Sequence, residues 1–528
     1  MSILKTGGEV KPRFALTSPL PGLSYSRSMN DSLHRRLTPP ALRYLLYFLL
    51  ALAAIALPVL LSRTSLPIVA FTYSRETVPF ELFGFSAALA ISLILLFELR
   101  RRDLSRLDQV LPVVLPALIG VYVLYLITDY STRSWDYSCY EGAASAIAHG
   151  VNPYYMEQGE ELTGSCYIYP PLTAQVMAWL FRLFAGTALP DKAAETRAWD
   201  RVFYLFQTVQ FFLVVAAAAL SYRFARRLGL NALPAGLLVA ALFVFNNPLL
   251  RTVRHNQVNL WTLVLVMAAI LLLPRYPWVS GLALALAIHI KITPGILVLI
   301  WLLTRRWKAV LGTVAGFAGI VFLQTGFGMN WTTWRQFLEF LFDPFGNPLL
   351  LRFPLFRDNS LHGLLENVLR FAGVLSTPPG TAPFSLFGSL AGLVTLAVVA
   401  WFALRFVQQE RRLREGFSSD ELNLYTHSMD ALALTLLVPP MVWEHHYVIA
   451  VPVIIWAAAT SPRNRLWIVA VAAALMLAVP TFDLFPFSYH RVAGLLMLLL
   501  LAAPRALEHD LLKVLASGPS PQKPVTQQ

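Results

Sequence analysis

The sequence carries little charge, and negative charge is its scarcest kind. Charged residues make up 13% of its 528 residues, with 29 acids against 42 lysines and arginines, whereas a typical soluble domain has about 25% charged residues. This scarcity excludes an ordinary soluble domain, and 57% of the residues are hydrophobic instead. They gather in blocks of roughly 12 to 21 residues, and the longer blocks match the ~20 residues that a helix needs to cross a bilayer. Because the blocks show no period-two alternation, they predict helices, and the chain is predicted to be an all-α polytopic membrane protein.

Two signatures of other protein classes are also missing. Residues 1–40 are polar and include no early apolar region, and the first long block lacks a small-residue cleavage site. We therefore interpret this block as a membrane anchor and not as a cleaved signal peptide. No Walker-type or Rossmann-type glycine motif is present, so any chemistry is expected to proceed without energy from a cytosolic nucleotide.

The net charge of +13 could indicate nucleic-acid binding, but every basic cluster adjoins an apolar block, which favours the positive-inside rule. With the N-terminus in the cytoplasm, about 14 crossings place all of these clusters on the cytoplasmic side. The predicted crossings lie near 44–62, 83–99, 110–128, 201–223, 232–246, 258–273, 278–290, 294–304, 309–323, 386–406, 429–443, 446–460, 466–480 and 491–503. Two long loops, 129–200 and 324–385, then face outward. We expect a multi-pass protein of the cell (plasma) membrane that binds no nucleic acid and whose polar chemistry is extracytoplasmic.

Cysteine is nearly absent as well. The two cysteines, Cys139 and Cys166, both fall in the first long outer loop. They are either two small buried apolar residues or a disulfide formed in an oxidising compartment. Such a bond would close a loop of about 27 residues and add ~3 kcal/mol of stability.

The outer loops contain two segments with the pattern of interfacial helices, 136–149 and 331–345, which suggest a roofed cavity at the membrane surface. Asp136 opens the first of them. It is either an acid in the first turn of a helix, bonding free N–H groups, or a general base that takes a proton from an attacking hydroxyl. Asp129 is the second candidate for this base.

A dense polar set follows the crossing near 232–246. Its members include Arg251, Arg254, His255, Gln257 and Asn259. They are either ordinary interfacial side chains or, because arginine on the outer side runs against the inside bias, a site for an anionic group such as a phosphate.

Four further residues are candidates for binding a phosphate or a sugar. Lys291 lies between two short apolar segments, so it either reaches the outer interface or is a functional charge within the membrane, for which a phosphate is the natural partner. Asn359 is consistent with helix capping alone. His445 and His446 are adjacent, and neighbouring helical side chains point about 100° apart, which suits a sugar or phosphate better than shared metal ligation. We predict neither a metal site nor a cofactor.

In their order along the chain, these motifs resemble a known family. They read WDYSCYEGAASAIAHGVNPYY, YIYPPL, RHNQVNLWTLVLV, GLALALAIHIKITPG, DNSLHGLL and LVPPMVWEHHYVIAVP. Together they resemble glycosyltransferase family 87, which contains polyprenyl-phosphate-mannose-dependent alpha-mannosyltransferases with the GT-C membrane fold. The resemblance covers about residues 120–460. Each motif is loose alone, and the six in this order are fairly specific.

The resemblance implies roles for particular residues. It implies that Asp136 is the catalytic aspartate, that the Gln-x-Asn element is Gln257 and Asn259, that the Lys-x-Thr-Pro element begins at Lys291, and that the His pair is His445 and His446. Three features depart from the family pattern: Asn256 stands where glycine is common, Asp-Asn-Ser-Leu begins at 358 where Asn-Gln-Ser-Leu is common, and a hairpin of crossings is added. The resulting layout is a cytoplasmic polar segment 1–43, an added transmembrane hairpin 44–109, a GT-C-like transmembrane catalytic domain 110–505 and a cytoplasmic tail 506–528.

The expected function is a membrane hexosyltransferase. It would move a sugar, mannose by resemblance, from a polyprenyl-phosphate donor to an extracytoplasmic glycolipid, glycan or protein, by an inverting single displacement. Arg254, Lys291 and His445 are the candidates for holding the donor phosphate. A transporter or flippase for a lipid or glycan is the alternative, and it would show several deep charges and an internal repeat. A non-enzymatic partner in envelope assembly would tolerate the loss of both Asp136 and Lys291.

Overall fold

The computed structural model describes residues 133, 135–158, 161–164, 166–186, 192–342, 358–374, 384–416, 418–439, 441–482 and 485–502, together with Leu49. The chain divides into two units, Met1–Ala53 and Ala54–Gln528. Apart from Leu49, every described residue lies in the second unit, which is described by itself below. The predicted crossings near 44–62, 83–99 and 110–128, and the candidate Asp129, lie outside the described residues.

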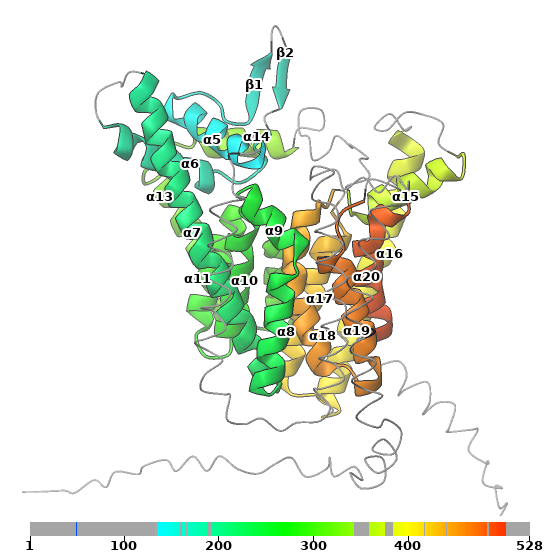
Figure 1. The fold of residues 1–528 in the computed structure, drawn as a ribbon. Helices are drawn as coiled ribbons and strands as arrows, with labels where there is room; N and C mark the ends of the chain where they lie inside the picture. Colours follow the sequence, from blue (N-terminus) through cyan, green and yellow to red (C-terminus); the bar gives the residue numbers. More distant parts are fainter. Residues whose placement is uncertain are drawn as a thin grey trace, which may run out of the picture. The chain divides into compact units, whose positions relative to one another are not determined.

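Helices make up most of the described part (Figure 1). The α-helices are α5 (Trp135–Ala148), α6 (Leu172–Ala185), α7 (Lys192–Arg227), α8 (Ala232–Val244), α9 (Asn247–Arg254), α10 (Asn259–Leu272), α11 (Pro277–Ile290), α12 (Ile296–Leu303), α13 (Trp307–Gln324), α14 (Thr332–Phe342), α15 (Leu361–Phe371), α16 (Phe384–Arg414), α17 (Asp420–Leu437), α18 (Ala450–Thr460), α19 (Leu466–Ala473) and α20 (His490–Met497). Short 3-10 and π helices are η2 (Thr293–Gly295), η3 (Glu444–Ile449), η4 (Arg463–Arg465), η5 (Ala474–Ala478), η6 (Phe487–Tyr489) and η7 (Leu498–Ala502). A helix therefore occurs at each predicted crossing from 201–223 onward.

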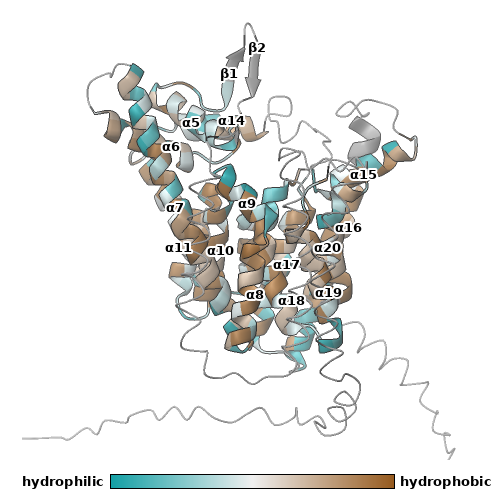
Figure 2. Ribbon diagram, viewed as in Figure 1, coloured by the Kyte–Doolittle hydropathy of each residue, from teal (hydrophilic) through white to brown (hydrophobic). Residues whose placement is uncertain are grey.

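Several of these helices can span a membrane. In the described part of the chain, α7, α13 and the Leu390–Arg414 portion of α16 are long and apolar enough by themselves, and α8 with α9 makes a fourth if this pair, bent by 52°, is one span. The bend falls where the side chain of Asn246 accepts from the Leu249 amide at 2.9 Å and Pro248 occupies the first turn of α9. Figure 2 shows that apolar residues dominate the long helices of the bundle. These features support a membrane protein, while the total of about 14 crossings stays a prediction.

One short hairpin departs from the all-α expectation in the described residues. Strands β1 (Tyr155–Gln158) and β2 (Glu161–Gly164) pair antiparallel, with Tyr155 opposite Gly164. The hairpin lies in the chain between the two cysteines, beside α5 and α14 at one end of the bundle (Figure 1).

The predicted crossing 429–443 differs in position from the helix that forms. Helix α17 begins earlier, at Asp420, and ends at Leu437. Its polar first half is helical because α16 supplies partners for it: Glu410 accepts from Asn423 at 2.7 Å and lies 3.0 Å from the ring of His427. A hydropathy pattern cannot register polar residues that are paired inside a helix bundle.

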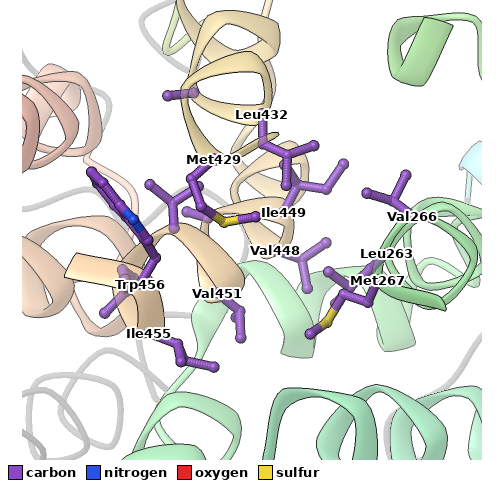
Figure 3. Packing of buried hydrophobic residues seen from close by; sticks show 14 of the residues in the cluster. Leu263, Val266, Met267, Met429, Leu432, Val448, Ile449, Val451, Ile455 and Trp456 are labelled. Atoms are coloured by element: carbon purple, nitrogen blue, oxygen red, sulfur yellow. The ribbon is translucent and has the colours of Figure 1, made fainter. Parts of the chain in front are cut away.

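The main core lies where α10, α17, η3 and α18 meet, and Figure 3 shows its packing. Its labelled members are Leu263, Val266 and Met267 of α10, Met429 and Leu432 of α17, Val448 and Ile449 of η3, and Val451, Ile455 and Trp456 of α18. Between membrane helices such contacts act through van der Waals packing, because lipid is as apolar as the side chains. This core anchors η3, and with it the predicted His pair.

A second buried cluster holds α14 onto the protein. Trp334, Phe337 and Phe340 are buried, and the ring of Tyr154 lies 5.5 Å from Phe337 and 5.3 Å from Phe340. The predicted segment 331–345 is thus helical over Thr332–Phe342, but its apolar face packs on protein while Trp331 remains 55% exposed. Helical spacing places Phe340 on the same face as Trp334 and Phe337, and this face meets the aromatic side chains that precede α6.

Helices α11 and α13 approach each other closely through glycine. A Cβ atom built on Gly281 would lie 2.4 Å from the carbonyl oxygen of Ala309, and one on Gly312 would lie 2.8 Å from that of Trp278. Small residues allow the backbones of membrane helices to touch in this way. The contact fixes α11, whose C-terminal end leads directly to Lys291.

Candidate active site

Asp136 lies in the first turn of α5, and several links hold this helix in place. Cys139, one turn further on, forms a disulfide with Cys166 across 5.5 Å between the Cα atoms. Just before the helix, Arg133 pairs with Asp200 of α7 at 2.7 Å. The start of α5 is therefore tied to α7 and to the segment that leads into α6.

The environment of Asp136 alters its acidity. Burial raises the pKa of this carboxyl group above its ordinary value, and the side chain of Gln257 and the charges of Arg251 and Lys291 partly oppose that rise. A carboxylate with a raised pKa binds a proton more readily than an exposed aspartate does. This property suits a general base that must take a proton from a hydroxyl group.

A chain of polar contacts joins Gln257 to Lys291. The side-chain nitrogen Nδ2 of Asn259 donates to Oε1 of Gln257 at 2.8 Å. Nζ of Lys291 donates to Oδ1 of the same asparagine at 2.9 Å. From α7, the side chain of Gln210 donates to the backbone oxygen of Gln257 at 2.6 Å. Residues separated by more than 30 positions in the sequence thus form one row beside Asp136.

Two backbone features make this row possible. Asn256 adopts a φ of 50°, so the chain turns sharply between α9 and α10. This left-handed region favours glycine, and asparagine is among the residues that tolerate it best, which explains why Asn256 can replace the common glycine. Lys291 follows α11 in an extended conformation, and Pro294 lies in η2 immediately after it. The break between α11 and η2 turns the lysine toward Asn259.

A buried carboxylate lies next to this row. Glu444 of η3 is 3.7 Å from Nε of Arg251 and 3.5 Å from Nη2 of Arg491, and it accepts a hydrogen bond from Thr481. Burial alone would raise the pKa of Glu444, but Arg491 and Arg251 lower it below its ordinary value. The carboxylate is therefore charged and shared between two arginines. Nη1 of Arg251 is buried and has no hydrogen-bond partner among the described residues.

The two histidines after Trp443 stand beside the same cations. The rings of His445 and His446 lie 4.6 Å apart, edge to face, and Lys291 acts electrostatically on both of them. His255 lies nearby, and burial together with Arg251 and Arg254 lowers its pKa to about 4, so its imidazole is neutral. The charge of Arg254 acts on His255.

Asn359 is bonded through its backbone to the segment that contains η3. Its backbone amide donates to the Val442 oxygen at 2.7 Å, and its backbone oxygen accepts from the hydroxyl of Tyr447 at 3.3 Å. Asp358 beside it accepts from the Val442 amide at 2.8 Å. These bonds attach residues 358 and 359 of the second long loop to Val442, which precedes η3, and to Tyr447 within η3.

Glu444 and Arg491 were not among the residues predicted for the site. Arg491 opens the last predicted crossing on its outer side, so the argument that singled out Arg251 and Arg254, arginine against the inside bias, would also have found it. Within the described ranges, no group of three His, Cys, Asp or Glu side chains could hold a metal ion.

The described site is thus one carboxylate with a raised pKa, facing cations at one end of a membrane helix bundle. Such an arrangement can deprotonate a hydroxyl group while it holds an anionic leaving group. This chemistry is that of group transfer from a phosphate-bearing donor.

Comparison with known proteins shows which family this chain resembles. Residues 167–419 match the family model of glycosyltransferase family 87, which confirms the resemblance inferred from the motifs. The matched range contains Gln257, Asn259 and Lys291, whereas Asp136 precedes it and His445 follows it.

Curated proteins give the same result. Over 249 residues the chain is 29% identical to a polyprenol-phosphate-mannose-dependent alpha-(1-2)-phosphatidylinositol mannoside mannosyltransferase of Mycolicibacterium smegmatis, covering 46% of this chain and 50% of that protein. Over 339 residues it is 28% identical to the Mycobacterium tuberculosis protein of the same name, covering 61% and 69%. Over 231 residues it is 29% identical to a phosphatidylinositol pentamannoside mannosyltransferase of M. smegmatis, covering 42% and 47%. The chain thus spans about half the length of the two M. smegmatis relatives. No solved structure matches it.

Proposed function

We propose that this protein is a membrane mannosyltransferase of the GT-C type that uses polyprenol-phosphate-mannose as its donor. The observation that carries the proposal is the position of Asp136 beside Gln257 and within the field of Arg251 and Lys291. The relatives named above use this donor. The N-terminus lies in the cytoplasm and the site opens to the extracytoplasmic face, because the loops that carry the site lack the basic clusters of the cytoplasmic side.

The cations hold the phosphate of the donor. Lys291 and Arg251 both act on Asp136, and Arg251 has a buried N–H group without a partner among the described residues. Arginine binds phosphate oxygens in bidentate fashion. We therefore assign Arg251, in preference to the Arg254 suggested by the sequence, to the phosphate, together with Lys291 and His445.

The reaction is one displacement. Asp136 takes the proton of the acceptor hydroxyl, the acceptor oxygen forms a bond to the anomeric carbon, and the bond from that carbon to the phosphate oxygen breaks with its electron pair. Attack from the face opposite the phosphate inverts the configuration, so a beta-linked donor gives an alpha product. The cations stabilise the charge that develops on the leaving phosphate, and no metal is required.

The acceptor is a glycolipid of the outer leaflet. The curated relatives act on phosphatidylinositol mannosides, and an acceptor anchored in lipid can reach a site at the end of the membrane helices. Transfer to a glycan or protein would instead give a labelled product that does not extract with lipid.

The test is transfer of labelled mannose by purified protein in lipid nanodiscs, comparing wild type with Asp136→Asn. The variant is expected to lose at least about 100-fold in rate, because general base catalysis contributes about 10²–10⁴-fold, while donor binding stays close to that of wild type. Glu339→Gln, which neutralises an exposed carboxylate of α14, is the matched control. Full activity of Asp136→Asn would disprove the assignment of the base and would direct the same test to Asp129.

A further inference from the structure

Asp136 has a second kind of neighbour besides the cations. Tyr140 lies one helical turn after it on α5, so both side chains project from the same face of that helix. The ring of Tyr140 lies 5.3 Å from that of Tyr169, edge to face. The charge of Asp136 acts on both phenols, so the carboxylate faces cations and a pair of tyrosines.

The backbone around Tyr169 is rigid. The hydroxyl of Tyr154 donates to the backbone oxygen of Tyr169 at 3.0 Å, and the hydroxyl of Tyr167 donates to the oxygen of Pro170 at 2.7 Å. Cys166, three residues before Tyr169, is bonded to α5 through Cys139. A ring held in this way is pre-organised for binding, because little conformational entropy is lost when a ligand contacts it.

The two tyrosines differ in access. Tyr140 is fully buried, and its hydroxyl makes no hydrogen bond of standard geometry with a described residue. Tyr169 is only partly buried. Burial, and after it the charge of Asp136, raises the pKa of Tyr169 far above the ordinary value for tyrosine, so its phenol stays protonated. The Tyr169 hydroxyl is therefore a neutral donor next to the base.

We propose that Tyr169, supported by Tyr140, forms the wall of the acceptor subsite and binds a hydroxyl-rich sugar or polyol ring beside the hydroxyl group that Asp136 activates. This inference rests on the function proposed above. In an inverting displacement the acceptor approaches from the side opposite the leaving phosphate. The cations are assigned to the phosphate, and the two phenols are further groups on which the charge of Asp136 acts, so we assign the phenols to the acceptor.

The chemistry of the wall fits such a ligand. A sugar ring presents C–H faces that pack on an aromatic ring and hydroxyl groups that bond a phenol, and binding sites commonly combine aromatic walls with a few fixed polar groups. A second phosphate would instead require cations, and neither residue of the wall is basic. Tyr140 fixes the tilt of the Tyr169 ring through their edge contact, so it is a positioning residue.

The experiment measures binding of each substrate separately to full-length protein in nanodiscs. The probes are phosphatidylinositol mannoside for the acceptor subsite and polyprenol-phosphate-mannose for the donor subsite. The variants are Tyr169→Phe, which removes the hydroxyl and keeps the ring, Tyr169→Ala, and Tyr140→Leu, which removes the ring that contacts Tyr169. Tyr204→Phe is the matched control, because Tyr204 is 64% exposed on α7.

We expect Tyr169→Phe to weaken glycolipid binding about three- to tenfold, the usual effect of one hydrogen bond, and Tyr169→Ala to weaken it further. Donor binding and the slow hydrolysis of donor by water should stay within about twofold of wild type. Substitutions that remove no contact to a ligand usually change its binding affinity by no more than this. In Tyr140→Leu, which removes the edge contact with the Tyr169 ring, the acceptor KM should rise while the donor KM stays constant.

Three results would overturn the inference: no glycolipid binding by wild type, unchanged glycolipid affinity in both Tyr169 variants, or an equal loss of donor affinity. If wild type binds both probes, the variants follow the expected pattern and no mannose is transferred, the proposed function fails while the subsite stands. Tyr169→Phe keeps the test valid even if Tyr169→Ala does not fold, because the ring contacts remain.

Discussion

The two ends of the helix bundle handle buried charge differently. Toward the end where α17 begins, basic side chains have their own carboxylates: Arg405 bonds both oxygens of Asp430 at 2.8 and 3.0 Å, and Arg306 bonds Asp420. At the site end, which carries α5, η3 and the start of α20, Arg251 and Arg491 flank the single carboxylate of Glu444, and the charges of Arg251 and Lys291 both act on Asp136.

This difference distinguishes ion pairs that only stabilise the fold from charges that can bind a ligand. A charge with a matched partner is already neutralised, and its removal affects stability alone. A carboxylate shared between two arginines leaves positive potential at the site, which favours an anionic ligand such as the donor phosphate proposed above. Four substitutions, in order of decreasing expected effect, test whether the distinction is real.

The largest effect is expected for Glu444→Gln. The change leaves Arg251 and Arg491 buried without their shared carboxylate, and breaking a buried ion pair from one side costs about 3–5 kcal/mol. Thermal unfolding in detergent should show a strongly reduced midpoint, and mannose transfer should be lost. Glu339→Gln serves again as control. A variant as stable as wild type would mean that the two arginines find other partners and that the shared carboxylate is not essential.

Arg405→Met should also destabilise, by about 3 kcal/mol, because it leaves Asp430 mostly buried and unpaired. The double variant Arg405→Met/Asp430→Leu should recover most of this loss, and transfer per folded molecule should stay at the wild-type rate throughout. The same double strategy at the site end, Glu444→Gln/Arg491→Met, should not restore transfer. Restoration there would erase the contrast between the two ends.

Lys291→Met should move the pH dependence of transfer. Lys291 helps to lower the pKa of Asp136, so its loss raises that pKa, and a base that must be deprotonated then becomes active only at higher pH. We expect the acid limb of the rate profile to shift upward by up to about one pH unit. Lys308→Met, at the exposed start of α13, should leave the limb unchanged. A shift to lower pH would contradict the assigned sign.

The smallest effect is expected for Asp420→Asn. Its carboxylate is 67% exposed and pairs with a partly exposed Arg306, and surface pairs contribute about 0–1 kcal/mol. Unfolding should change by less than about 1 kcal/mol and transfer not at all. A larger loss would indicate that this pair controls how α12 and α17 meet.

The sequence predicted more of the helices than of the contacts between them. Apolar blocks located the helices from α7 onward, because hydropathy depends on composition alone. Asp136, Gln257 and Lys291 could be singled out because polar residues stand out in apolar surroundings, and the structure brings these three together. Glu444 and Arg491 were missed as a pair, since their meeting depends on how η3 packs against α20. The role proposed for Arg251 likewise depends on the orientation of α9, which its sequence does not reveal.

The turn at Asn256 is another feature that residue identity alone does not reveal. Asn256 departs from the family pattern, and its left-handed conformation explains how it can stand where glycine is common. Residue identity alone cannot distinguish a lost motif from one preserved by a residue with similar backbone freedom.

The glycine contact between α11 and α13 has a consequence for anyone who surveys variants of this protein. A methyl group at Gly281 would meet the backbone of α13, and rigid helices pass such a displacement along their length to Lys291. Loss-of-function substitutions will therefore map to a lipid-embedded helix contact that touches no substrate. A reader of such a map would be led to place the active site too deep in the membrane.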